Sequence, residues 1–99
     1  MYVLKGATRA RVSELCRRYT VRRLDLVGSG ARRDFDPATS DLDLLVEFVD
    51  QPSMHSYFGL KDELEAALGR PVDLIMPAAV SNPFVRAHME RDRANMYAT

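Results

Sequence analysis

Apolar residues recur at spacings typical of helices in two segments of the chain. In residues 9–19, apolar side chains stand at positions i, i+3, i+4 and i+7, which predicts a helix with one buried stripe. Residues 56–68 carry a similar stripe, and Gly69 follows them as a residue that commonly ends helices. We therefore expect two amphipathic helices that each bury one face.

Three short apolar runs predict β-strands at residues 23–27, 41–48 and 71–76. The middle run has consecutive apolar residues at 44–46, a pattern typical of a strand that is covered on both faces. Helices that alternate with such strands favour a small mixed sheet with helices packed on it.

Two further helices complete the predicted order. A short helix is expected at residues 30–33, directly after the first strand. The last helix is expected to begin at Asn82, a good capping residue followed by Pro83, and its thin apolar stripe reaches Met96. The order α-β-α-β-α-β-α predicts an α/β or α+β fold, a small mixed sheet with flanking helices, in a single domain over residues 1–99.

Composition narrows the classes of function. Lys plus Arg and Asp plus Glu each total 14, and this balance argues against direct binding of nucleic acid through a broad basic surface. The chain has one cysteine, Cys16, so it cannot form an intrachain disulfide. Its sequence contains neither a signal peptide nor an apolar run long enough to cross a membrane. We expect a cytoplasmic protein without membrane attachment.

Two carboxylates stand close together at the start of the middle predicted strand. Asp41 and Asp43 would point to the same face, because side chains alternate along a strand. Neighbouring negative charges repel, and Mg²⁺, which binds one or two carboxylates together with phosphate oxygens, would stabilise them. Taken alone, this short motif is more typical of a turn followed by a solvent-facing strand start.

Two other features strengthen the interpretation of these carboxylates as a metal site. Gly28-Ser29-Gly30 follows the first predicted strand, where glycine permits close backbone approach and a helix N-terminus favours phosphate. Asp73 interrupts the third predicted strand, and a buried carboxylate is costly unless it is paired or bound to metal. An ordinary turn and a solvent-exposed edge strand would explain each feature separately. Their combination is much rarer and points to a site for a cation and phosphates.

Three motifs in this order resemble those of the minimal nucleotidyltransferases of the polymerase-β superfamily, the MntA-like proteins. They are GSGAR at residues 28–32, SDLDLLV at residues 40–46 and PVDLI at residues 71–75. The likeness covers most of the chain. It implies a polymerase-β-like nucleotidyltransferase fold, and transfer of a nucleotidyl group to a hydroxyl with pyrophosphate as the leaving group.

The resemblance also implies a role for each matching residue. It assigns binding of the nucleotide triphosphate to three residues: Gly28, Ser29 and Arg32. Asp41 and Asp43 would bind two Mg²⁺ ions. Asp73 would complete the metal site and help activate the attacking hydroxyl, so these three carboxylates are the implied catalytic residues.

Members of this family often form toxin–antitoxin pairs with a HEPN-domain protein. In those pairs the nucleotidyltransferase is the antitoxin and adenylylates a tyrosine of the HEPN ribonuclease. The resemblance therefore implies ATP as the substrate and a HEPN toxin as the partner, with a homo- or hetero-oligomer compatible with it. The small size of the chain leaves little room for an acceptor-binding domain, which favours a protein acceptor.

Two alternative functions stay open. Eleven residues, 30–40, separate Ser29 from Asp41, one more than is usual in the family, and Arg33 stands where the family commonly has glycine. An antitoxin that neutralises its partner by contact alone, with weak or no catalysis, would tolerate both departures. The other alternative is a small-molecule nucleotidyltransferase that is completed by a second subunit.

Overall fold

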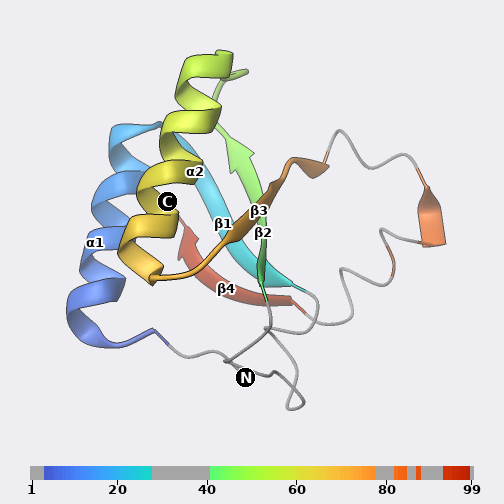
Figure 1. Cartoon of the computed structure of the whole chain (residues 1–99). Coiled ribbons are helices and arrows are strands. Elements are labelled where there is room, and N and C mark those ends of the chain that lie inside the picture. Colours follow the sequence, from blue (N-terminus) through green and yellow to red (C-terminus); the bar gives the residue numbers. More distant parts are fainter. Residues whose placement is uncertain (1–3, 28–40, 78–81, 85–86, 88–92, 99) are drawn as a thin grey trace.

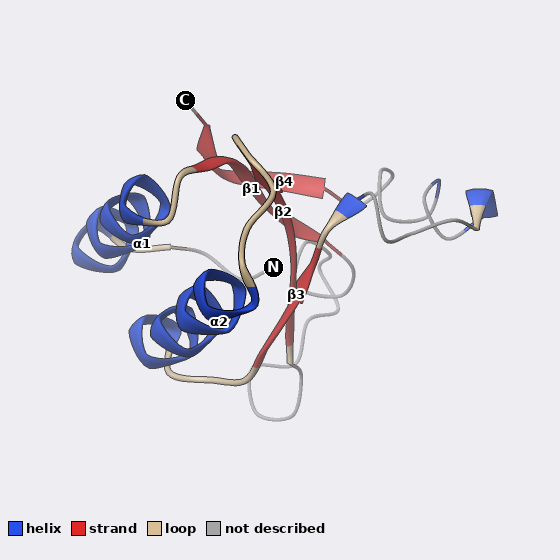
Figure 2. Cartoon of the chain, turned by 90° about the horizontal axis from the view of Figure 1, so that it is seen from above, coloured by secondary structure: helices blue, strands red, loops and turns tan. Residues whose placement is uncertain are grey.

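The computed structural model describes residues 4–27, 41–77, 82–84, 87 and 93–98. Its elements are α1 (Gly6–Arg18), β1 (Val21–Val27), β2 (Leu42–Phe48), α2 (Met54–Leu68), β3 (Val72–Ile75) and β4 (Arg93–Ala98). In this part of the chain, both helices pack against the same face of one sheet (Figures 1 and 2). The predicted combination of a small mixed sheet with flanking helices is confirmed.

The sheet has the strand order β3-β2-β1-β4. β1 pairs antiparallel with both β2 and β4, whereas β2 pairs parallel with β3. β1 and β2 are therefore the inner strands. Leu44, Leu45 and Val46 in β2 are at most 3% exposed, which confirms that this strand is covered on both faces.

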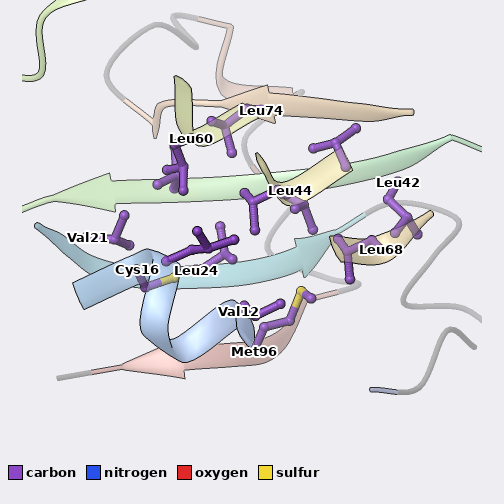
Figure 3. Close-up of a cluster of buried hydrophobic side chains, with 14 of the residues drawn as sticks. Val12, Cys16, Val21, Leu24, Leu42, Leu44, Leu60, Leu68, Leu74 and Met96 are labelled. Atoms are coloured by element: carbon purple, nitrogen blue, oxygen red, sulfur yellow. The ribbon is translucent and has the colours of Figure 1, made fainter. Parts of the chain in front are cut away.

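One hydrophobic core fills the space between the sheet and the two helices (Figure 3). Each helix contributes three fully or nearly fully buried residues: Val12, Leu15 and Cys16 from α1, and Leu60, Leu64 and Leu68 from α2. They pack against alternate residues of the strands, among them Leu24 and Leu26 of β1 and Leu42 and Leu44 of β2. Burial of each such leucine contributes about 1.5–3 kcal/mol. The residues between them, Asp25 and Asp43, consequently face away from the helices.

The ends of α2 follow local sequence signals. The Ser53 side chain accepts a hydrogen bond from the backbone N–H of Ser56 at 3.0 Å and caps the first turn. Gly69 ends the helix in a left-handed conformation with φ of 72°, as expected for a glycine stop. Neither α1 nor α2 is long and apolar enough to cross a membrane, and no other helix in the described part of the chain is.

The final predicted helix is wrong in its last part. Residues 93–98 form β4, a fourth strand that pairs with β1. Met96, assigned to a helical stripe, lies in the strand and packs into the core with 5% exposure. The pairing partner is about 70 residues away in sequence, and no local pattern reports such a contact. The short helix predicted at residues 30–33 falls outside the described residues.

Candidate functional site

Asp43 and Asp73 are neighbours across the parallel ladder of β2 and β3. Both residues alternate with buried leucines or valines of the core, so both lie on the sheet face opposite the helices. Adjacent strands are roughly 4.8 Å apart, which brings carboxylates from two separate segments close together. The predicted convergence of these two strands on one face is therefore present in the structure.

Asp41 directly precedes β2 and is exposed. Its charge nonetheless acts on Asp43: the pKa of Asp43 is raised above its usual value of 3.8, first by burial and then by the negative charges of Asp73 and Asp41. Asp43 thus interacts electrostatically with both of the other predicted acids. Asp43 is half-buried, and burial together with the two neighbouring acids disfavours its charged form.

Among the described residues, no three Asp, Glu, His or Cys side chains are arranged as a ready-made cage for a metal ion. The donor set still fits Mg²⁺, a hard cation that binds through one or two carboxylates and takes its other ligands from water and substrate phosphates. Burial first, and then the charges of Asp73 and Asp41, raise the pKa of Asp43, and a bound cation would relieve the repulsion from these two acids.

The predicted nucleotide-binding residues follow β1 in the chain. Gly28, Ser29 and Arg32 all lie outside the described residues. Val27, the last residue of β1, is paired with Asp43. The described part of β1 therefore ends beside Asp43, one residue before the predicted phosphate-binding segment in the sequence.

A further carboxylate on this sheet face was not selected from the sequence. Asp25 of β1 is fully buried; two side chains donate hydrogen bonds to it and a third forms an ion pair with it. Arg93 Nε contacts its Oδ2 atom, Arg23 Nε lies 2.8 Å from the same oxygen, and Asn95 Nδ2 lies 2.9 Å from Oδ1. Like Asp73, Asp25 interrupts an apolar run in the sequence, and this pattern could have identified it as a candidate buried acid. Its cationic partner Arg93 lies 68 residues away in sequence, so their contact could not be read locally.

A hollow of about 570 Å³ opens near Phe48, at the opposite end of β2 from Asp41. Its lining comes from the start of β1, the end of β2 and the residues that follow β2 and β3: Arg22, Val46, Glu47, Phe48, Val49, Asp50, Gln51, Pro52, Met76 and Pro77. Asp43 and Asp73 are absent from this lining. The pair of acids and this hollow are therefore separate features of the molecule.

Comparisons with known proteins find similar sequences over most of the chain. Residues 10–97 match the family model described as a nucleotidyltransferase domain. A Methanocaldococcus jannaschii protein named as a candidate protein adenylyltransferase is 35% identical over 89 residues, which cover 90% of each chain. The protein adenylyltransferase MntA of Thermococcus cleftensis is 37% identical over 73 residues, 74% of this chain and 73% of that protein.

A solved structure has the same fold at low sequence identity. It is a tri-AMPylated HEPN toxin of Shewanella oneidensis in complex with its MNT antitoxin, and the matching chain has a TM-score of 0.66 and 18% identity. The match covers 94% of this chain and 71% of the other. At this identity the likeness concerns the fold.

Proposed function

Because the chain belongs to the nucleotidyltransferase domain family, we propose that it transfers AMP from ATP to a hydroxyl group of a partner protein. The observation that carries the proposal is the pairing of Asp43 with Asp73 on adjacent strands. Val27, at the end of β1, lies on the other side of Asp43 and leads into Gly28 and Ser29. The described end of β1 therefore lies beside Asp43, and the proposed phosphate-binding residues follow it in the sequence.

The proposed acceptor is a tyrosine hydroxyl of a HEPN-domain toxin, and the chain is proposed to act as its antitoxin in the cytoplasm. Two findings support this choice. Relatives at 35% and 37% identity are named for protein adenylylation. A protein of the same fold occurs in a complex with an AMPylated HEPN toxin.

In the proposed reaction the acids have separate tasks. Asp41, Asp43 and Asp73 would hold Mg²⁺, which when bound stabilises negative charge on the attacking and leaving oxygens of an in-line displacement. Asp73, at the more exposed strand, would accept the proton of the attacking hydroxyl. Gly28, Ser29 and Arg32 would orient the triphosphate so that pyrophosphate leaves opposite the incoming oxygen.

The test uses the whole chain, ATP labelled at the α-phosphate, Mg²⁺ and a HEPN-domain protein from the same genome. We expect label on the HEPN protein, and loss of at least about 100-fold in rate for Asp43→Asn, because one charged ligand of the cation is removed. Asp62→Asn is the matched control, since it makes the same chemical change on the exposed side of α2. Undiminished labelling by Asp43→Asn would refute the assigned role of the acids.

A contact-only antitoxin is the second candidate, and two features of the sequence favour it. Eleven residues, 30–40, separate Ser29 from Asp41, and Arg33 stands where the family commonly has glycine. In this case Asp43→Asn would still suppress the toxicity of the partner in cells, although no AMP would be transferred. Growth of cells that express the partner together with each variant separates the two functions.

A further inference from the structure

One arginine connects three strands on the face that carries the acids. Arg93 lies in β4, its Nε atom donates to Asp25 in β1, and its Nη2 atom lies 3.9 Å from Glu47 Oε2 in β2. Its side chain is only 14% exposed. A charged group so well covered is normally held by partners in a fixed position.

The backbone register places Arg93 in one line with the acidic pair. Val27 of β1 pairs with Arg93 on one side and with Asp43 on the other, and Asp43 in turn pairs with Asp73. We call these four residues, Asp73, Asp43, Val27 and Arg93, the Val27 row. The row crosses all four described strands at the point where β1 ends.

The Arg93 side chain contacts residues outside the Val27 row. Asp25 lies two residues before Val27 on β1, and Glu47 lies four residues after Asp43 on β2, so both partners are displaced from the row in the same direction. The guanidinium therefore points away from Asp43 and from the end of β1. Arg93 can influence the acids through the strands that it holds.

A register shift between β1 and β4 makes the contact between Arg93 and Asp25 possible. The register between β1 and β4 shifts between Leu24 and Asp25, so that Asp25 stands opposite Asn95. Bulges of this kind re-aim side chains. Here the shift lets two donors from β4 reach one fully buried carboxylate, whose burial would otherwise be strongly unfavourable.

We propose that Arg93 is a positioning residue for nucleotidyl transfer: by holding Asp25 and Glu47 it fixes the end of β1 against Asp43. This inference rests on the proposed function, because it concerns the geometry of that reaction's site. Val27 pairs with Asp43, so a small displacement of the end of β1 changes the position of that strand relative to the proposed catalytic acid. Misplacement by about 1 Å can lower a rate by roughly 100-fold.

The first experiment compares Arg93→Met and Arg93→Lys with the wild type in the labelling assay, well below each melting temperature. We expect Arg93→Met to lower kcat by about 10- to 100-fold. Arg93→Lys should be intermediate, because it keeps the charge and loses the fork of donors. The matched control is Arg22→Met, which also removes a partner of Glu47, at 3.7 Å, but leaves Asp25 untouched; its kcat should equal that of the wild type.

The second experiment separates positioning from stability. The double variant Asp25→Leu/Arg93→Met removes both buried charges, and a buried pair can often be replaced by apolar residues without loss of stability. We expect its melting temperature to recover relative to Arg93→Met, while kcat stays low. A double variant that regains wild-type kcat together with its melting temperature would show that Arg93 acts on stability alone. Should Arg93→Met not fold, Arg93→Lys and the double variant decide the question.

Amide hydrogen exchange does not depend on catalysis, so it tests the positioning role of Arg93 separately from the proposed function. We expect amide hydrogen exchange at Val27 and Asp43 to become about tenfold faster in Arg93→Lys and to be unchanged in Arg22→Met. Wild-type protein that transfers no AMP would refute the proposed function. Unchanged exchange at both positions would refute the positioning role, whether or not AMP is transferred.

Discussion

Asp43 of β2 stands opposite Asp73 of β3 on the sheet face away from the helices. Two acids at neighbouring positions of a parallel ladder destabilise the free protein, since like charges face each other with one of them half-buried. An arrangement that is unfavourable for folding and favourable for a divalent cation indicates a binding function.

Removal of one negative charge from the pair should stabilise the protein in the absence of divalent cations. Asp43→Asn removes a charge that is disfavoured first by burial and then by repulsion from Asp73 and Asp41, the causes that raise the pKa of Asp43. Solvent screening limits the gain to a few tenths of a kcal/mol. Thermal unfolding with EDTA measures it, and Asp62→Asn serves as control. With excess Mg²⁺ the order should reverse, because the wild type alone keeps the full site; the same order under both conditions would contradict the prediction.

The advantage of Asp43→Asn should depend on pH in a defined direction. The folded-state pKa of Asp43 is raised above 3.8, so the folded protein binds this proton more tightly than the unfolded chain. Its unfavourable contribution is complete above the folded pKa and disappears as the pH falls through that value. In EDTA, the difference in unfolding free energy between variant and wild type should therefore be larger at pH 7 than at pH 3. A difference that is independent of pH would argue against this charge coupling.

Loss of Arg93 should destabilise the fold strongly. Arg93→Ala leaves the fully buried carboxylate of Asp25 with Arg23 and Asn95 as its remaining donors. Breaking a buried pair by removing one partner costs about 3–5 kcal/mol. Urea unfolding measures the loss. Arg22→Ala, which removes an exposed partner of Glu47, should stay within about 0.5 kcal/mol of the wild type; equal effects of both variants would contradict the prediction.

The glycine that ends α2 should be sensitive to substitution for a conformational reason. Gly69 has φ of 72°, and no atom lies within 4 Å of the position where a Cβ would stand. Gly69→Ala should thus cost about 1–2 kcal/mol through the left-handed backbone alone. Gly6, at the start of α1, also has open space around its Cβ position and no positive φ. Gly6→Ala should be neutral or stabilising. Thermal unfolding of both variants measures the two effects.

The sequence by itself determined the local elements and the chemical class. The periodicity of apolar residues predicted α1, α2 and the first three strands, each within a few residues, since helical and extended spacing are local properties. The order of the motifs around residues 28–32, 40–46 and 71–75 indicated the nucleotidyltransferase family, which the comparisons confirm. The phosphate-binding roles of Gly28, Ser29 and Arg32 stay predictions.

Tertiary structure alone decided the fourth strand and the contacts across the sheet. Residues 93–98 carry a weak apolar pattern that fits a helix as well as a strand, and their pairing with β1 gives them hydrogen bonds and a place for Met96 in the core. The same pairing brings Arg93 to Asp25. Both outcomes come from contacts between segments about 70 residues apart, whose free energy depends on the assembled sheet and is absent from either segment alone.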